Sequence, residues 1–422
     1  MRILISHPNY PAQFRRLAPA LAQQGHELVF LHENAEWHAP PANGVRLISY
    51  EPERSGGGAT IHPYLRRMET AVLQGQAAYR ACEKLKQEGW QPDWIFNHVG
   101  FGNGLYLADA FPNARRIGLF EWYYNAFGSD VDFLRGGMVD VNRQLRVRTW
   151  NAQTLLELAA CDHCITPTAW QRQQFPEWMR PRLQVIHEGI DFELMAQLRA
   201  ADLGRPACLP TDPELEIVTY LSRGFEEYRG FPQAMQALAL LQQLRPQAHV
   251  LIVGADVVAY GAGRSDGRSW QQWAQQEVPL DPARTHWLGI LQDQAYHQVL
   301  ACSTVHLYLT VPFVLSWSLL EAMAAGCTIV ASNTPPVQEV LCHGSSALLV
   351  DFFSPQAQAE AIAGLLQDGH QRQHLANGAR ARAKAYDSKR GLTAWTALLG
   401  PEMSVDNDQT ALTKCKMQLH PV

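Results

Sequence analysis

Two arginines with a spacing suited to phosphate chemistry stand in the segment YLSRGFEEYRG, residues 220–230. Arg223 and Arg229 follow an apolar run that is typical of a β-strand. A guanidinium group presents a planar fork of donors that matches phosphate oxygens, and fixed positive charge would stabilise a departing diphosphate. A second interpretation stays open, because the adjacent acids Glu226 and Glu227 are also typical of a solvated, charged surface.

A single carboxylate, Glu321, lies inside the apolar segment LTVPFVLSWSLLEAMAAG, residues 309–326. A carboxylate in such surroundings is costly to bury unless it has partners. Ser318-Leu-Leu-Glu321 fits a capping box, in which Glu321 would reach back to the Ser318 backbone. The other partner is a ligand, because a helix that begins near Trp317 would offer N–H groups and a favourable dipole to an anion.

The elements that must position these residues form two similar series. Short apolar strands alternate with helical segments from Arg2–Ser6 to about residue 168, and the alternation restarts near residue 215. This alternation predicts an α/β protein with parallel sheets and right-handed crossovers. Residues 257–270 read as an insertion loop and residues 354–400 as helical. Because doubly wound sheets bind ligands at the carboxyl ends of their strands, we expect the site in a cleft between two such domains.

The order of the motifs resembles retaining glycosyltransferases of family 4 (GT4), which have the GT-B fold of two Rossmann-like doubly wound domains that face a central cleft. The resemblance rests on VIHEGID (residues 185–191), the two arginines, THWLGIL (residues 285–291) and the segment 309–326. It covers most of residues 1–400 and is most specific from about residue 185 to 350.

The resemblance implies a division of the chain by function. It places the acceptor-side domain at residues 1–195 and the nucleotide-sugar donor domain at residues 196–385. Residues 386–400 would form a helix that crosses back to the first domain, and residues 401–422 would be a disordered tail. The reaction implied is transfer of a sugar from a nucleotide-diphosphate sugar to an acceptor hydroxyl, with retention of configuration and without a metal ion or other cofactor.

The resemblance also implies roles for particular residues. His98, at the end of the strand DWIFNHV, would face the donor sugar and act in catalysis together with Arg223 and Arg229. Glu321 would hold the ribose hydroxyls. The full set of donor-binding candidates is Gly289, Ile290, Leu291, Ser316, Trp317, Ser318, Leu319 and Glu321, and weaker acceptor-side candidates are Asn9 and Glu121.

The sequence departs from the family pattern at Phe313, where the family keeps a glutamate that contacts the transferred sugar, eight residues before Glu321. A phenyl ring accepts no hydrogen bond from sugar hydroxyls, so recognition of the donor sugar must differ, with Ser316 and the backbone around it taking over some contacts. The family also usually has Lys where this chain has Arg229. Two alternatives therefore stay open: a catalytically silent nucleotide-sugar-binding protein of the same fold, and a GT-B epimerase that acts on the nucleotide sugar.

Composition excludes some functions. The 422 residues include 35 basic and 40 acidic side chains, for a net charge of −5, and no basic tract that would bind nucleic acid. The acceptor would be a glycan, a lipid-linked sugar or a small molecule. The N-terminus lacks the features of a signal peptide and no apolar run is long enough to span a membrane. We expect a cytoplasmic protein with at most peripheral contact with the inner face of the membrane.

Two further spacings suggest metal chemistry but lack support. Cys161-Asp-His-Cys164 has zinc or redox spacing without a second pair, so its thiols read as structural. Asp130-Val-Asp132 has the spacing of metal-dependent glycosyltransferases, yet it follows no clear strand. We interpret it as an acid pair in a loop and expect no metal site.

Overall fold

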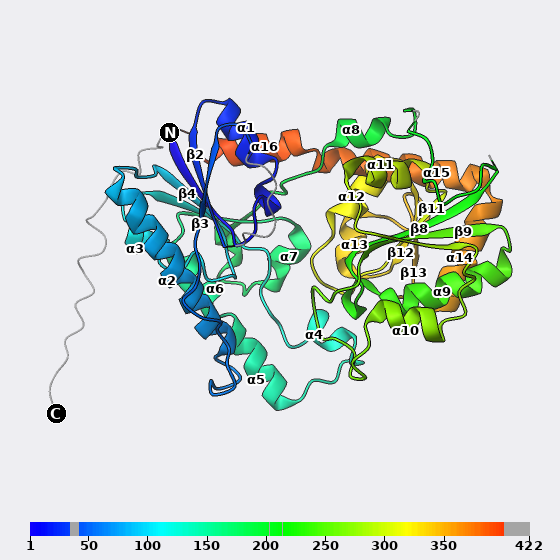
Figure 1. Ribbon diagram of the computed structural model, residues 1–422, viewed down its shortest axis with the longest axis horizontal. Coiled ribbons are helices and arrows are strands. Elements are labelled where there is room, and N and C mark those ends of the chain that lie inside the picture. Colours follow the sequence, from blue (N-terminus) through cyan, green and yellow to red (C-terminus); the bar gives the residue numbers. More distant parts are fainter. Residues whose placement is uncertain (34–41, 202, 213, 401–422) are drawn as a thin grey trace.

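The computed structural model describes residues 1–33, 42–201, 203–212 and 214–400. The tail predicted for residues 401–422 lies outside the described residues. Two sheets stand next to each other along the long axis, each covered by helices on both faces (Figure 1). The predicted GT-B architecture of two Rossmann-like doubly wound halves is confirmed.

The N-terminal sheet has seven parallel strands in the order β3-β2-β1-β4-β5-β6-β7. These strands are β1 (Arg2–Ser6), β2 (Glu27–His32), β3 (Val45–Ser49), β4 (Trp94–His98), β5 (Arg115–Leu119), β6 (His163–Thr166) and β7 (Leu183–Val185). The helices of this half are η1 (Ala12–Phe14), α1 (Leu17–Gln23), α2 (Arg66–Gln87), α3 (Leu107–Ala110), α4 (Asp130–Phe133), α5 (Val141–Trp150), α6 (Ala152–Ala160), α7 (Ala169–Gln174) and η2 (Arg180–Arg182).

The C-terminal sheet has six parallel strands in the order β10-β9-β8-β11-β12-β13. These strands are β8 (Glu216–Gly224), β9 (Ala248–Ala255), β10 (Thr285–Gly289), β11 (Val305–Tyr308), β12 (Thr328–Ser332) and β13 (Leu348–Val350). The remaining helices are α8 (Phe192–Gln197), η3 (Glu227–Arg229), α9 (Phe231–Leu244), α10 (Trp270–Glu277), α11 (Asp293–Cys302), α12 (Trp317–Ala324), α13 (Pro335–Val340), α14 (Pro355–Gln367), α15 (Gly369–Ala383), η4 (Lys384–Tyr386) and α16 (Ser388–Ala397).

The strands are apolar on both sides because helices cover both faces of each sheet. In β9, Val250 and Ile252 belong to one hydrophobic cluster, whereas Leu251 and Val253 belong to the cluster on the opposite face. Alternate residues of a strand point to opposite faces, so a continuous apolar run is the pattern expected for a parallel sheet buried on both sides.

The longest described helix, α2, and the edge strands β3 and β7 were not predicted from the sequence. The buried stripe of α2 consists largely of small residues such as Ala71, Gly75 and Ala78, which give only a weak periodic signal. The helical segment between β1 and β2 is divided into η1 and α1.

The chain crosses between the halves twice at one edge of the molecule. Ile190 forms a parallel β-bridge with Asp387. The Ile190 N–H donates to the Tyr386 carbonyl (2.8 Å), and the Ser388 N–H donates to the Ile190 carbonyl (2.8 Å). The following helix, α16, lies over the N-terminal half beside α1 (Figure 1). Its Trp395 packs into the N-terminal core, where it contacts Phe14 and Phe96. None of the helices in the described ranges is long and apolar enough to cross a bilayer.

Candidate functional site

Three side chains meet just beyond the carboxyl ends of adjacent N-terminal strands. His7 follows β1, His98 ends β4 and Glu121 follows β5. The rings of His7 and His98 lie 4.9 Å apart, and His98 Nε2 is 3.5 Å from Glu121 Oε2. Gln13 donates a hydrogen bond of 3.2 Å to Glu121. The predicted strand-end position of His98 is therefore confirmed, and the sheet brings Glu121 to it.

The electrostatics of this group favour an ionised carboxylate. Burial by itself would raise the pKa of Glu121, but the hydrogen bond and charge of His98, with smaller contributions from Gln13 and Arg229, hold that pKa below its usual value. The pKa of His7 lies well below its usual value, first because His7 is buried and then because of His98. His7 Nε2 is buried and unpartnered in the described structure. The sequence analysis missed His7, although it stands at the end of the first strand as His98 does at the end of β4.

Arg229 reaches the same region from the C-terminal half. Its side chain is buried, and Nη1 donates to the Thr310 hydroxyl (2.8 Å) and the Val314 carbonyl (2.9 Å). Burial by itself would lower the pKa of Arg229. Tyr308, Tyr260 and other nearby acidic groups outweigh burial and raise that pKa, so the guanidinium is charged. Among the residues that the structure describes, Arg229 makes its hydrogen bonds through Nη1 alone, so the other donors of the fork remain for a ligand.

Arg223 differs from Arg229 in its environment. It lies near the carboxyl end of β8 and is exposed, and its charge lowers the pKa of His7 in the opposite half. Within the described ranges it makes no hydrogen bond or ion pair. The two arginines that the sequence placed together therefore face the His7–His98–Glu121 group from the other half. Arg229 is held there by two hydrogen bonds, whereas Arg223 is exposed.

Helix α12 begins at Trp317, as predicted, but its N-cap is not the predicted residue Ser318. Ser316 is the N-cap, and its hydroxyl accepts from the Ser318 backbone. The capping box between Ser318 and Glu321 is therefore wrong, because Ser318 is already the second helical residue and the third, Leu319, has no carboxylate. Leu319 is fully buried, and its N–H donates to the Ser316 carbonyl (3.2 Å).

Glu321 finds its partners outside its own helix. The Tyr296 hydroxyl donates to Oε2 at 2.7 Å, and Arg16 Nη2 of the N-terminal half lies 3.6 Å from Oε1. Arg16 also donates to the Gly189 carbonyl at the crossing between the halves. Glu321 thus takes part in an ion pair that joins the two halves.

Trp317, at the first turn of α12, lies beside this ion pair. Its Nε1 donates to the Glu188 carboxylate, and the Arg15 guanidinium lies 5.4 Å from the centre of its ring. Arg15, Arg16 and Glu188 were not among the predicted site residues. The adjacent pair Arg15-Arg16 was the available signal.

The remaining predicted donor residues follow β10. Gly289 has a φ of +65° and ends the strand, Ile290 is exposed and Leu291 packs against the core. The predicted acceptor-side residue Asn9 donates from its backbone N–H to His7 Nδ1 (2.8 Å).

Phe313 lies in an aromatic group that joins the halves. Its ring contacts Trp122 of the N-terminal half, with 4.8 Å between ring centroids, and Tyr228 and Tyr260 of its own half at 5.4 and 5.1 Å. Tyr260 comes from the predicted insertion loop. Phe313 is 6% exposed, so its ring lies in an apolar, aromatic environment.

The acid pair at residues 130 and 132 is not in a loop, which corrects the prediction. Both residues belong to the short helix α4, where Asp132 completes a capping box with Ser129. Asp130 accepts a hydrogen bond of 2.7 Å from the Tyr228 hydroxyl of the C-terminal half. The two carboxylates therefore have structural roles. Over the described part of the chain, no three His, Cys, Asp or Glu side chains gather as metal ligands would.

Comparison with solved structures shows the same architecture. Sucrose-phosphate synthase from Thermosynechococcus elongatus has a TM-score of 0.67 at 19% identity, over 94% of this chain and 98% of that one. HepE from Anabaena, in complex with UDP, has a TM-score of 0.64 at 17% identity, over 94% and 99%. These likenesses establish the fold class, which is that of the GT-B proteins.

Sequence comparison identifies the family. Residues 24–195 match the glycosyl transferase family 4 group, and residues 209–382 match the glycosyl transferases group 1. The phosphatidyl-myo-inositol mannosyltransferase of Mycolicibacterium smegmatis is 25% identical over 377 residues, 88% of this chain and 84% of the relative. The D-inositol 3-phosphate glycosyltransferase of Corynebacterium urealyticum is 42% identical over 67 residues, 16% of each chain. The protein is a glycosyltransferase of the GT4 type.

Proposed function

We propose that this enzyme transfers a sugar from a nucleotide-diphosphate sugar to an acceptor hydroxyl, with retention of configuration and without a metal ion. The proposal rests chiefly on Arg229, a buried and charged guanidinium whose free donors lie near the His98–Glu121 pair. The structural neighbour HepE from Anabaena is solved in complex with UDP and with UDP-glucose, which supports a donor of this class.

In the proposed reaction, the C-terminal half binds the donor and the N-terminal half binds the acceptor. Arg229 and the exposed Arg223 would neutralise charge that develops on the departing diphosphate. Glu321 would bind the ribose hydroxyls after exchanging its contact with Arg16. His98, oriented by Glu121, would contact the donor sugar from the opposite half.

Retention is proposed to follow front-face attack, in which the departing phosphate oxygen accepts the proton of the acceptor hydroxyl. The carboxylates near the site are already engaged, Glu121 by His98 and Gln13, and Glu321 by Tyr296 and Arg16. The epimerase alternative would need two carboxylates at one carbon atom. Their separate engagement favours transfer over epimerisation.

The proposal is tested first by thermal shift with UDP, GDP and ADP, because a nucleotide that binds the folded state raises the melting temperature. The nucleotide that stabilises the protein is then titrated into Arg229→Gln, for which we expect about ten- to a hundredfold weaker binding. Arg245→Gln is the matched control, because Arg245 pairs with Glu216 at the amino-terminal end of β8.

Unchanged affinity in Arg229→Gln would overturn the phosphate assignment. Transfer itself is measured as release of free nucleotide from the sugar of the selected nucleotide, with and without a pool of glycan acceptors. Acceptor-dependent release is expected. A protein that binds the nucleotide sugar but never releases nucleotide would instead be the silent binder.

A further inference from the structure

The loop after β4 holds an exposed phenyl ring against the two histidines of the candidate site. Phe101 is 41% exposed, and the centre of its ring lies 5.1 Å from that of His7 and 5.0 Å from that of His98. Single exposed apolar side chains are common on protein surfaces. Phe101 differs from most of them because its ring packs on both histidines and still has an exposed part that a ligand could contact.

The residues on either side of Phe101 are held in place. The Gly100 carbonyl accepts a hydrogen bond from the Gln153 side chain. Gly102 has a φ of +93° and packs so closely on α2 that a Cβ at this position would lie 2.2 Å from the Cα of Ala71. The phenyl ring is therefore presented in a fixed position, which lowers the entropy that a ligand loses on binding to it.

A pair of polar side chains lies at the carboxyl end of the neighbouring strand β2. Glu33 directly follows β2, and its N–H donates to the Pro8 carbonyl (2.9 Å), next to His7. Gln74 of α2 donates to Glu33 Oε1 at 2.7 Å. Among the described residues, Glu33 forms no ion pair, and Gln74 Oε1 is buried without a partner. A bound hydroxyl group would supply the missing hydrogen bonds.

A phenol lies beside this pair. Tyr50 follows β3, and its N–H donates to the His32 carbonyl at 2.8 Å. The Tyr50 hydroxyl is buried and has no partner in the part of the chain that the structure describes. Burial and then the charge of Glu33 raise the pKa of Tyr50, so the phenol keeps its proton beside a carboxylate. The ends of β2 and β3 are thus polar and acidic.

Helix α2 brings the polar pair close to the phenyl ring. Gly75 packs against the same loop as Phe101, because a Cβ on Gly75 would lie 2.9 Å from the Gly102 carbonyl oxygen. Gln74 is the residue before Gly75 on this helix. The Glu33–Gln74 pair and Phe101 therefore border the same part of the N-terminal half.

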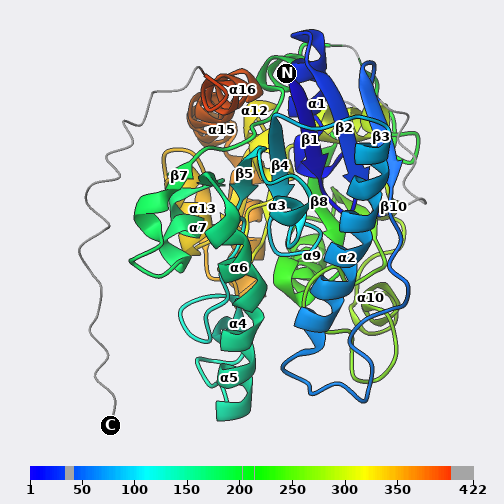
Figure 2. The same cartoon turned by 90° about the vertical axis from the view of Figure 1, so that its left-hand side faces the viewer.

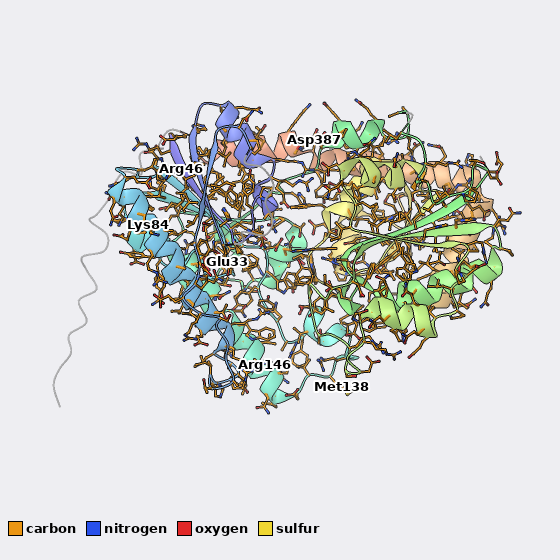
Figure 3. The ribbon with its side chains drawn as sticks, viewed as in Figure 1. Glu33, Arg46, Lys84, Met138, Arg146 and Asp387 are labelled. Atoms are coloured by element: carbon orange, nitrogen blue, oxygen red, sulfur yellow. The ribbon has the colours of Figure 1, made fainter. Side chains whose placement is uncertain are left out.

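This part of the N-terminal half faces inward. Helix α2 runs beside α3, next to the strands β3, β2, β1 and β4 in that order (Figure 2). Glu33 lies nearer to the C-terminal half than Arg46 and Lys84 do (Figure 3). An acceptor that approaches the donor from the N-terminal half would pass this surface.

We infer that Phe101, Glu33 and Gln74 form a subsite for an uncharged polyol ring of the acceptor, such as a pyranose. This inference rests on the proposed function, because it takes the N-terminal half to bind the acceptor. The apolar C–H face of the ring stacks on the exposed part of the Phe101 ring, and its hydroxyl groups bond with Glu33 and Gln74. The carboxylate of Glu33 repels a phosphoryl group, so the subsite selects a ring without one.

The experiment measures binding of three unphosphorylated sugars by saturation-transfer NMR: methyl α-D-glucopyranoside, methyl α-D-mannopyranoside and methyl α-D-galactopyranoside. The full-length protein is first saturated with the nucleoside diphosphate that stabilises it best. We expect the wild type to bind at least one of them. Phe101→Leu should bind it about three- to tenfold more weakly, and Glu33→Gln about tenfold more weakly. Absence of binding to the wild type, or binding that survives both substitutions, overturns the subsite.

Two variants serve as matched controls. Glu27→Gln changes a carboxylate at the other end of β2, where Glu27 pairs with Arg2. Phe127→Leu changes a phenyl ring that is 52% exposed and lies outside the described ring contacts of His7 and His98. Both controls should bind the pyranoside as the wild type does, and an equal loss in either one contradicts the assignment.

A probe without the additional hydroxyl groups tests whether they are recognised. Cyclohexanol has a ring of similar size with one hydroxyl group, so it should bind at least about tenfold more weakly than the pyranoside. Equal binding of cyclohexanol would mean that Glu33 and Gln74 do not read hydroxyl groups, and the inference would be wrong.

Thermal melts without ligand separate a binding site from a structural role. Phe101→Leu keeps an apolar side chain and Glu33→Gln keeps an acceptor for Gln74, so both should melt close to the wild-type temperature. A large drop in melting temperature together with lost pyranoside binding would make these residues structural elements and contradict the proposal. Nucleoside diphosphate affinity should be unchanged in both variants. A failure of the donor assignment is read from Arg229→Gln, and a failure of transfer from nucleotide release, so neither is confused with loss of this subsite.

Discussion

The ring of Phe313 meets the indole of Trp122 edge to face, with 4.8 Å between centroids, across the two halves of the protein. Trp122 comes from the segment after β5, and Phe313 from the segment between β11 and α12. Trp122 is 9% exposed and lies within a hydrophobic cluster whose other fully buried members come from the C-terminal half. An aromatic contact of Phe313 therefore joins the two halves of the protein.

Truncation of Phe313 is expected to lower stability. Phe313→Ala removes a buried ring from three aromatic neighbours and should cost about 3–4 kcal/mol in the free energy of unfolding, measured by urea denaturation. Phe353→Ala is the control, because Phe353 also stacks on a residue of the other half, Phe133, but is 50% exposed. If Phe353→Ala lowered the free energy of unfolding as much as Phe313→Ala, burial of the Phe313 ring would not explain the effect.

The ion pair between Arg16 and Glu321 predicts opposite effects of two substitutions on nucleotide affinity. If Glu321 binds ribose, Glu321→Gln weakens nucleotide binding by roughly tenfold, because a charged acceptor is lost. Arg16→Met removes a competing partner of Glu321, so it should leave nucleotide affinity unchanged or increase it a few-fold. Calorimetric titration of both variants checks this. Weaker binding in Arg16→Met would show that Arg16 contacts the nucleotide itself.

We expect the contribution of Glu121 to the stability of the folded protein to depend on pH. Its folded-state pKa lies below the ordinary value of 4.5, which means that the folded protein favours the ionised form. The resulting stabilisation is present above pH 4.5 and is lost as the pH falls through the folded-state pKa. Glu121→Gln should therefore lower the melting temperature at pH 7, with a difference from wild type that shrinks toward pH 4. In a His98→Ala background the substitution should cost less, because the hydrogen bond has already been removed.

For Glu157 we expect the opposite effect, a stability that falls as the pH rises. This carboxyl is buried in α6, accepts a hydrogen bond from Asn97, and has a pKa raised by burial from 4.5 to about 7. Between these two values the folded protein keeps a proton that the unfolded chain releases, so stability falls as the pH rises. The loss is at most about 3 kcal/mol.

Glu157→Gln keeps an acceptor for Asn97 and has no charge to bury. The variant should gain melting temperature over the wild type as the pH rises from 5 to 8, while Glu360→Gln on the surface should show no such trend. A constant difference between Glu157→Gln and wild type across this range would mean that Glu157 does not titrate there.

Candidate site residues could be predicted from the sequence only where neighbouring residues along the chain form a recognisable strand or helix pattern. Arg223, Arg229 and His98 were found because each stands at or just after the end of an apolar strand. The partners of Glu321 were not found, because Tyr296 lies 25 residues earlier and Arg16 comes from the other half of the chain. No spacing rule connects residues that meet only after two sheets have formed.

The sequence by itself determined that the chain folds into two parallel α/β halves, because alternating apolar strands and helices leave few other ways to bury both faces of each sheet. It also determined that His98, Arg223 and Arg229 stand at or just after the ends of apolar strands. Only the tertiary structure decided what these and other side chains contact, including Glu121 beside His98 and Trp122 against Phe313. The physical reason is that burial and charge depend on neighbours from distant segments, whereas secondary structure depends mainly on residues a few positions apart.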